Sequence, residues 1–372
     1  MFRSRRSPTA DSGLPGRRGS LRQHAPGILG TAPPCPLAAR TRAELGCADG
    51  LSTRREQPVT GYAPGLQQVG EGFYAYLQPD GGWGWSNAGL VVDGEATLLV
   101  DTLFDLRLTA EMLRAMRAAV PAAARIDTLV NTHADGDHCW GNQLLGDARI
   151  VASQRTAAEM GELPPTTMAA LAEQAPNMGE LGAFFLDCFG AFDFSGIELV
   201  LPQHTFNGQL TLSVGARELQ LIEVGPAHTR GDTLVYAPGA GVLFSGDILF
   251  SGSHPIAWAG PVSNWIAACE LILAMKPEVI VPGHGPLATP DAVRELKQYF
   301  EYLYELARER HAAGMTPLQA ARSISDDRWA RWGNAERLVV NIANIYSELD
   351  GEQRPVNPLA AFEQMAQLAA RG

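Results

Sequence analysis

One short polar run constrains this chain more than any other part of its sequence. Within six residues, directly after the apolar stretch 126–130, stand four potential metal ligands: His133, Asp135, Asp137 and His138. Side chains of this kind on one loop would repel one another, or lose hydration without compensation, unless a cation sat among them. Because the run follows a predicted strand, the fold has to present these side chains at the end of a sheet.

Three more candidate ligands follow at later strand ends. They are His228 in the run Gly-Pro-Ala-His-Thr-Arg-Gly-Asp, Asp247 in Leu-Phe-Ser-Gly-Asp-Ile-Leu, and His284 in Val-Ile-Val-Pro-Gly-His-Gly. Each lies where an apolar strand gives way to Gly or Pro, which is how a sheet delivers side chains to one rim. Imidazole and carboxylate together suit a divalent ion such as zinc, iron or manganese.

The set resembles the five-motif signature of the metallo-β-lactamase superfamily, whose first long motif reads His-x-His-x-Asp-His. The resemblance covers roughly residues 70–290, with all motifs in the family's order. It implies the α/β class and an αββα sandwich, with helices covering the outer faces of two packed sheets.

The resemblance also implies a role for each candidate ligand. His133 and His228 would hold the first of two divalent metal ions, most commonly Zn²⁺. Asp137, His138 and His284 would hold the second. Asp247 would bridge the two ions, and Asp137 and Asp247 would be the catalytic carboxylates.

Asp135 departs from the family pattern, because it stands where the second His of the motif is expected. As a ligand it would add a third carboxylate, which favours iron or manganese over zinc and makes a bridging water less acidic. Diiron members of the superfamily that handle oxygen similarly replace this His with a carboxylate, usually the longer Glu. The alternative is that Asp, one methylene shorter, does not reach the ion and leaves the first site weak.

Other residues near the motifs are candidates for the substrate wall or for supporting roles. Trp83, Trp85, Trp258 and His254 are predicted to line the mouth of the site, a wall that suits an apolar substrate. Asp232 is expected either to orient an imidazole or to shape a turn. A Phe-rich segment at 181–192 is expected either to form a lid or to pack in the core.

These residues predict a hydrolase. A metal-bound hydroxide would attack the carbonyl of an ester, thioester, lactone or amide of an apolar small molecule, without a covalent enzyme intermediate. The alternative, based on Asp135, is a non-haem diiron protein of the same fold that binds oxygen or acts in redox chemistry. Membership of a fold does not fix the substrate, and β-lactam hydrolysis is not favoured.

The rest of the chain is predicted to form one domain with two helical additions. Residues 1–60 carry ten Arg against four acidic residues and many Gly, Pro and Ser, a composition typical of disorder. Residues 61–372 form the predicted metallo-β-lactamase-like domain, with a helical insert at 152–201 and a helical C-terminal extension at 291–372. Predicted strands are 72–77, 87–92, 97–102, 126–132, 211–214, 219–224, 233–236 and 242–245. Predicted helices are 106–120, 156–160, 166–174, 181–192, 291–313, 317–324 and 335–349.

Composition excludes several classes of partner. The net charge of −11 argues against nucleic acid. The sequence has no run of 18 apolar residues, so no membrane span is expected. Five cysteines, an odd number without metal-type or redox-type spacing, favour a reduced cytoplasmic protein. A small-molecule substrate is the expected partner, and the sequence leaves the oligomeric state open.

Overall fold

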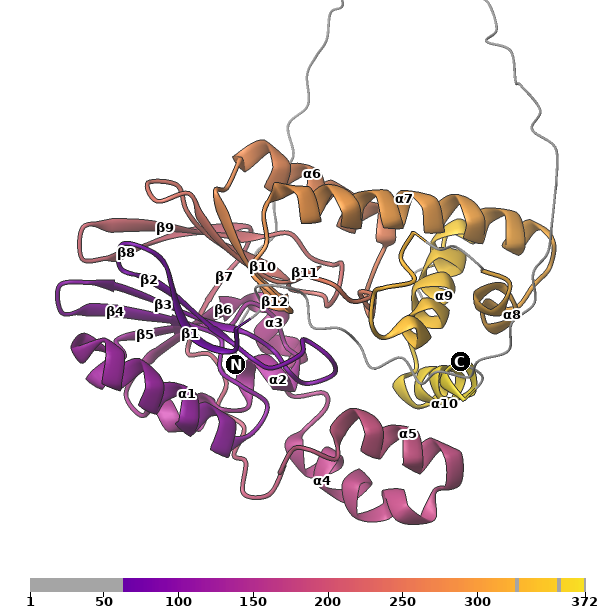
Figure 1. The fold of residues 1–372 in the computed structure, drawn as a ribbon, viewed down its shortest axis with the longest axis horizontal. Helices are drawn as coiled ribbons and strands as arrows, with labels where there is room; N and C mark the ends of the chain where they lie inside the picture. Colours follow the sequence, from indigo (N-terminus) through magenta and orange to yellow (C-terminus); the bar gives the residue numbers. More distant parts are fainter. Residues whose placement is uncertain (1–62, 325–327, 353–355, 371–372) are drawn as a thin grey trace, which may run out of the picture. The chain divides into compact units, whose positions relative to one another are not determined.

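Two β-sheets packed face to face lie at the centre of the computed structural model, which describes residues 63–324, 328–352 and 356–370 (Figure 1). The disorder predicted for residues 1–60 falls outside this range. The first sheet has seven strands in chain order: β1 (Gly65–Gly70), β2 (Phe73–Leu77), β3 (Ala88–Asp93), β4 (Ala96–Val100), β5 (Thr128–Val130), β6 (Arg149–Ser153) and β7 (His204–Phe206). The second has five, in the order β12 (Val279–His284), β11 (Val242–Phe250), β10 (Thr233–Ala237), β9 (Arg217–Glu223) and β8 (Gln209–Val214).

Strand β2 shows how the sequence places the first sheet between two apolar layers. Phe73, Ala75 and Leu77 are buried and pack in the core between the sheets. Tyr74 and Tyr76 alternate with them, are partly buried and pack in the cluster on the opposite face. Because side chains on a strand alternate between the two faces, one strand serves both layers.

Helix α1 (Leu106–Ala119) covers the outer face of the first sheet. It begins at Asp105, whose carboxylate accepts a hydrogen bond from the Leu108 backbone N–H at 2.6 Å. Its apolar stripe of Leu108, Met112 and Met116 packs in one cluster with Leu99 of β4.

Helices α6 (Val262–Met275) and α7 (Pro290–Ala312) cover the second sheet, with Trp265 and Leu296 clustered against Leu243 of β11. The predicted αββα sandwich is therefore confirmed.

The helical insert consists of α3 (Gln154–Glu159), α4 (Pro165–Gln174) and α5 (Gly179–Phe189), joined by short turns. Phe185, Phe189 and Phe192 are buried in the cluster beneath α1, whereas Phe184 is partly buried and packs against Phe362. Of the two alternatives for this Phe-rich segment, core packing accounts for the three buried rings.

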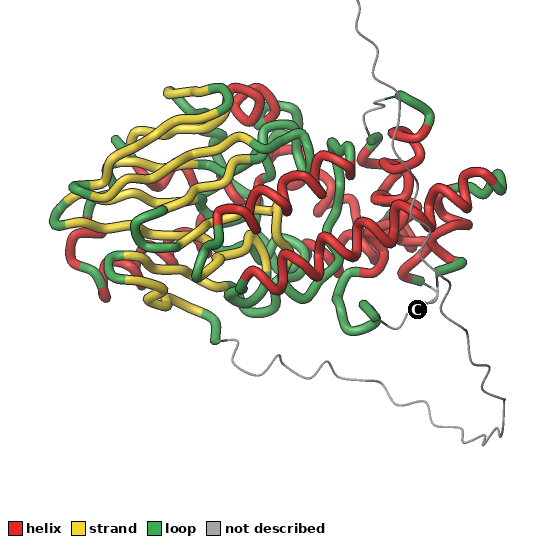
Figure 2. The backbone as a smooth tube through the Cα atoms, turned by 90° about the horizontal axis from the view of Figure 1, so that it is seen from above, coloured by secondary structure: helices red, strands yellow, loops and turns green. Residues whose placement is uncertain are grey.

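The C-terminal extension continues α7 with α8 (Pro317–Arg322), the short 3₁₀ turn η4 (Ala335–Arg337), α9 (Leu338–Leu349) and α10 (Pro358–Ala369). These helices lie beyond one end of the strands (Figures 1 and 2). Helix α10 returns toward the insert, where Phe362 contacts Phe189 with ring centroids 5.7 Å apart.

Several elements are absent from the ranges predicted from the sequence, among them β1, β6, β7, α6 and α10. Helix α6 is apolar on most of its surface, so its sequence lacks a clear stripe with a period of 3.6 residues. Strand β7 has three residues, two of them exposed, and gives little alternation to detect. Among the described residues, every helix is too short or too polar to span a lipid bilayer.

Candidate metal centre

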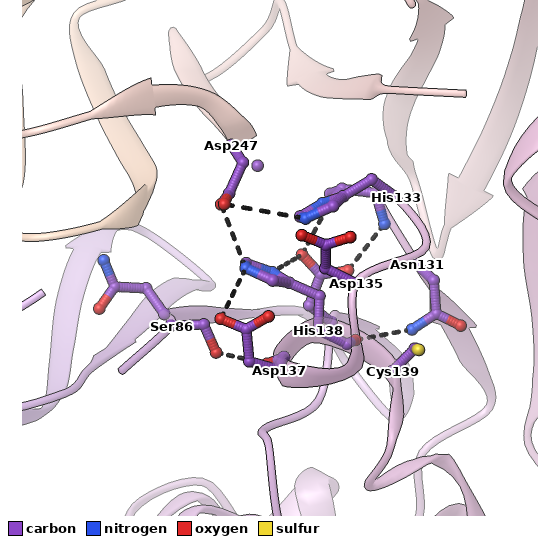
Figure 3. A network of polar contacts seen from close by, with 12 residues as sticks. Ser86, Asn131, His133, Asp135, Asp137, His138, Cys139 and Asp247 are labelled. Carbon is purple, nitrogen blue, oxygen red and sulfur yellow. Dashed lines mark hydrogen bonds and ion pairs between the residues drawn. The ribbon is translucent and has the colours of Figure 1, made fainter. Parts of the chain in front are cut away.

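The His133 loop connects β5 to a single helical turn, α2 (Gly136–Cys139). Asp135 occupies the N-cap position, while Asp137 and His138 lie in the turn itself. The Ser86 hydroxyl donates a hydrogen bond to the Asp137 carbonyl, and Asn131 Nδ2 donates to the His138 carbonyl at 2.9 Å. Figure 3 shows these polar contacts fixing the loop around the cluster.

Six of the seven predicted ligands form two groups of three, in each of which the potential ligand atoms lie within 4.8 Å of one another. One group is His133, His228 and Asp247, and the other is Asp137, His138 and His284. All six residues are buried. The division is the one that the resemblance implies, with each group able to hold one ion.

The Asp247 carboxylate lies at the centre of the four imidazoles. Its Oδ2 is 3.3 Å from His284 Nε2, 3.4 Å from His228 Nε2 and 3.8 Å from His133 Nε2. Its Oδ1 is 3.1 Å from His138 Nε2. One carboxylate thus faces ligand atoms of both groups, which is the position of a bridging ligand.

The seventh candidate, Asp135, lies at the edge of the first group. Its Oδ2 is 3.0 Å from Nε2 of His228, and its side chain is 34% exposed, whereas that of His228 is 1% exposed. The carboxylate therefore reaches the nitrogen that faces Asp247, in spite of being one methylene shorter than Glu.

Every imidazole of the cluster is held at Nδ1 by an acceptor. His228 Nδ1 donates to the Ile256 carbonyl at 2.7 Å and His284 Nδ1 to the Gly82 carbonyl at 3.1 Å. A carbonyl oxygen can only accept, so Nδ1 of each ring carries the hydrogen. In the neutral rings, Nε2 therefore presents a lone pair toward Asp247.

Asp101 and Thr132 fix the other two rings in the same way. Asp101 Oδ2 lies 3.0 Å from His138 Nδ1 and accepts from the Thr132 hydroxyl at 2.7 Å. That hydroxyl has given its one hydrogen to the carboxylate, so it accepts from His133 Nδ1 at 2.9 Å. When the rings are neutral, all four Nε2 atoms thus offer a lone pair to a cation.

The charges of the cluster favour added positive charge. Burial lowers the pKa of His138, but the carboxylates of Asp247 and Asp137 outweigh it and hold that pKa well above its usual range. Burial also opposes the charge on His228, yet Asp135 and Asp247 raise its pKa to about 10. The pKa of Asp247 is held well below its usual value because the imidazoles outweigh its burial.

Unpaired atoms give a direct test of whether this donor set fits a metal ion. His133 Nε2 is buried without a hydrogen-bond partner, and burial holds its pKa well below the usual range. His138 Nε2 and Asp247 Oδ1 face each other without hydrogen-bond geometry. Buried polar atoms of this kind are costly unless something binds them, so the residues fit divalent cations.

Asp101 was missed in the sequence, where it was assigned to the end of a predicted strand. It directly follows β4 with φ of 62°, and its carboxylate is 2% exposed. An acidic residue ending an apolar strand is the signal that could have identified it. Asp232, for which two roles were open, accepts from the Thr229 N–H, the Thr229 hydroxyl and the Ala227 N–H, and so shapes the turn that carries His228.

The predicted wall residues lie in different surroundings. Trp83 lies in the segment that connects the antiparallel strands β2 and β3, which we call the hairpin tip. Its ring contacts those of Phe189, Trp258 and Phe362. Trp85 packs on Phe192 with centroids 4.7 Å apart. Trp83, Phe189 and Phe362 contact one another and so join the hairpin tip, the insert and α10.

His254 lies outside both ligand groups. Its Nδ1 is 3.2 Å from the Tyr299 hydroxyl, and it borders a cavity lined by Trp329 and Trp332 within the C-terminal helices. Its role in substrate binding stays a prediction.

Comparisons with known proteins identify the family of the chain. The sequence model of the Metallo-beta-lactamase superfamily matches residues 81–284. The chain is 25% identical over 211 residues to acyl-coenzyme A thioesterase MBLAC2 of Gallus gallus, covering 54% of this chain and 72% of the relative. It is 24% identical over 241 residues to the alpha subunit of 2,4-dinitroanisole O-demethylase of Nocardioides sp. (strain JS1661), covering 64% of this chain and 62% of the relative.

A solved structure shares the fold. The sec-alkylsulfatase Pisa1 from Pseudomonas sp. superposes with a TM-score of 0.61 at 16% identity, covering 79% of this chain. The superposed part is 52% of that structure, so the chain spans about half of its length.

Proposed function

The chain belongs to the metallo-β-lactamase superfamily, and on that premise we propose that it hydrolyses an ester or thioester of a largely apolar small molecule at a dinuclear metal centre. Lactones and amides belong to the same reaction class. The observation that carries this proposal is the position of Asp247 among the four Nε2 atoms of His133, His138, His228 and His284. When bound, two divalent ions would supply Lewis acidity and would lower the pKa of a bound water toward neutrality.

The residues of the chain would divide the work as follows. Asp247 and the four imidazoles would hold the ions, and the Nδ1 contacts of the imidazoles would keep the ring orientations fixed. Asp137 has the more exposed of the two buried carboxylates, with a side chain 13% exposed against 3% for Asp247. We assign Asp137 a second role, in which it accepts a hydrogen bond from the attacking water and orients it toward the carbonyl carbon.

The proposed ions are zinc, with iron or manganese as alternatives. Four imidazoles favour zinc, whereas each added carboxylate shifts the preference toward the harder ions. The position of Asp135 supports its role as a fourth ligand of the first group, because its Oδ2 lies 3.0 Å from His228 Nε2.

The substrate class is supported by the aromatic residues of the mouth and by one relative. Trp83, Trp258 and Phe362 supply flat apolar surface. The relative of Gallus gallus is named as a thioesterase of acyl-coenzyme A, which favours a thioester or ester over an amide in this chain.

The test combines metal analysis with hydrolysis. Protein purified without chelators is analysed for bound metals and assayed with acyl thioesters and acyl esters of increasing chain length. We expect about two divalent ions per chain, the count of a dinuclear site, and thioester hydrolysis that increases with acyl length. The variant Asp247→Asn should lose metal and activity, whereas His204→Asn, at an exposed histidine of β7, should keep both. A full metal content with no hydrolysis of any acyl substrate would contradict the proposal.

Asp135 also supports the alternative of a diiron protein that binds oxygen. That alternative predicts iron as the bound metal, an oxo-to-iron absorption band in the near ultraviolet and oxygen uptake with a reductant. Zinc in the purified protein, or hydrolysis unaffected by removal of oxygen, would exclude it.

A further inference from the structure

Arg337, the last residue of η4, carries a buried guanidinium beside the metal centre. Arg337 as a whole is 1% exposed. Its Nη1 donates to the His254 carbonyl at 2.9 Å, whereas its Nε has no hydrogen-bond partner. None of the described residues offers an acceptor to Nη2 or places a carboxylate within ion-pair distance. A buried cation in this state is costly, so a function is expected of it.

The acidic groups near Arg337 have other partners. The Glu336 carboxylate accepts a hydrogen bond from the Trp83 indole N–H at 2.7 Å. The charges of Asp247 and Asp137 also act on the guanidinium, but both carboxylates belong to the proposed metal ligands. Once those carboxylates bind cations, the Glu336 carboxylate is the main remaining anion that acts on Arg337, and among the described residues it makes no ion pair with the guanidinium.

Two aromatic contacts connect Arg337 to the reaction site. The guanidinium carbon lies 4.1 Å from the centre of the Trp83 ring and 5.2 Å from that of Phe250. The Phe250 ring is stacked on the imidazole of His284, with centroids 5.1 Å apart and an interplanar angle of 9°. On the other side, Gly82, the neighbour of Trp83, accepts from His284 Nδ1. Arg337 therefore contacts two aromatic residues, Trp83 and Phe250, that both lie next to the proposed ligand His284.

The unused edge of the guanidinium has a specific chemistry. Two aromatic rings contact the guanidinium, and its Nη1 donates a hydrogen bond to the His254 carbonyl. The free Nε and Nη2 form the side-on fork that binds the two oxygens of a carboxylate, phosphate or sulfate in parallel.

We propose that Arg337 binds an oxyanion carried by the substrate, so that the substrate is an apolar ester or thioester with a carboxylate, phosphate or sulfate group remote from the scissile bond. The inference rests on the proposed function for the identity of the reacting group, but anion binding by Arg337 can be measured without hydrolysis. Trp83 would then have two uses, as apolar wall and as the ring that orients the guanidinium.

The test measures binding to the metal-loaded protein by isothermal titration calorimetry. Straight-chain dicarboxylates from succinate to pimelate are compared with monocarboxylates of the same length, and ω-phosphate and ω-sulfate acids are compared in the same series. One carboxylate can contact the metal centre in every compound, so only the second anion reports on Arg337. We expect the best dianion to bind at least about tenfold more tightly than its monoanionic match, a typical effect of a charge-assisted bidentate pair.

Three variants separate anion binding from structural support. Arg337→Met should bring the ratio of dianion to monoanion affinity close to one, and Arg337→Lys, which keeps the charge but lacks the fork, should leave a smaller ratio than wild type. Arg322→Met is the control, since Arg322 ties α8 to the Gln367 carbonyl in the same extension and should leave the ratio unchanged. If Arg337 only braces Trp83, Arg337→Met lowers the melting temperature and both affinities alike, which overturns the proposal. An equal affinity of wild type for both classes of acid overturns it as well.

The two proposals fail separately. Dianion preference that depends on Arg337, in a protein that hydrolyses no acyl substrate, would overturn the proposed function and retain this inference. Acyl hydrolysis without a dianion preference would retain the proposed function and overturn this inference. If Arg337→Met does not fold, the Arg337→Lys ratio decides the outcome.

Discussion

Asp135 Oδ2 lies 3.0 Å from His228 Nε2, the nitrogen that also faces Asp247. The carboxylate that stands where the resemblance implies a second histidine therefore reaches the first ligand group. We predict that Asp135→Ala lowers the metal content from about two ions toward one, the loss of one site of a dinuclear pair.

Asp135→His should restore the family pattern and shift the preference toward zinc, because it removes one carboxylate. The more acidic bridging water should move the basic limb of the hydrolysis profile to lower pH. Metal analysis and pH profiles of both variants check this. If neither variant changes metal identity, stoichiometry or profile, Asp135 has no special role.

Removing either member of the adjacent pair Asp137 and His138 should empty the second site. We expect Asp137→Ala and His138→Ala each to abolish most of the activity and to lower bound metal, because each removes one of three ligands in that group. Unchanged metal content and turnover in both variants would disprove the assignment of the site.

Asp101 is predicted to act on the metal through His138. Loss of its carboxylate in Asp101→Asn removes the charge that stabilises the Nδ1–H of that imidazole, and metal affinity should fall about 10–100-fold. Competition with a chelator gives the affinity. Asp127→Asn is the matched control, because Asp127 also accepts hydrogen bonds at a strand end, from Thr97, but lies in no ligand group. Equal affinities in the two variants would show that Asp101 supports only the loop.

A methyl group at Gly283 should displace the bridging carboxylate. A Cβ at this position would overlap Asp247 Oδ1 and come within 2.7 Å of the Gly246 carbonyl carbon. We expect Gly283→Ala to lower both metal content and melting temperature. Gly239→Ala, at an exposed turn where an added Cβ meets nothing within 4 Å, should change neither. Normal metal binding by Gly283→Ala would mean that Asp247 is not needed in its observed place.

The buried imidazole of His254 should make stability depend on pH. Burial lowers its pKa to about 4, and the charge of Arg337 acts in the same direction. Between about pH 4 and pH 6.5 the unfolded chain then binds more protons at this residue than the folded one, so stability is present above pH 6.5 and is lost as pH falls. The loss attributable to His254 is up to about 3 kcal/mol.

This prediction is measured as the difference between wild type and His254→Gln in urea unfolding at pH 7 and at pH 4.5. The substitution should remove part of the acid-dependent loss, and His204→Gln should not, since His204 is exposed. Parallel pH curves for wild type and His254→Gln would contradict it.

The proposed ligand positions could be predicted from the sequence because each is a polar residue at the point where an apolar strand ends, and this pattern is local. The two groups of three ligand atoms follow from that pattern once the strand ends meet. The supporting contacts were less accessible. Asp101 precedes His138 by 37 residues, and the hydrogen bond between them exists only after β4 and β5 pair in parallel.

Tertiary context also explains the missed elements. Helix α6 is apolar around most of its circumference, so periodicity could not identify it. Arg337 looked like an ordinary charged residue of a helical tail. Its burial results from the return of the extension to Trp83, a contact 254 residues apart in the sequence that no local pattern records.

The meeting of Trp83 with Phe362 has an evolutionary consequence. The family's sequence model ends at residue 284, whereas Phe362 belongs to α10, far beyond it. The proposed metal ligands thus lie within the part that the family model matches, whereas Phe362, which contacts Trp83, lies in a segment beyond it. If Phe362 belongs to the proposed substrate wall, substitutions in that segment should change which molecules are accepted without altering the proposed ligands. In that case, we expect that grafting the C-terminal helices of a relative onto this sandwich exchanges selectivity, which a comparison of acyl substrates before and after the exchange would measure.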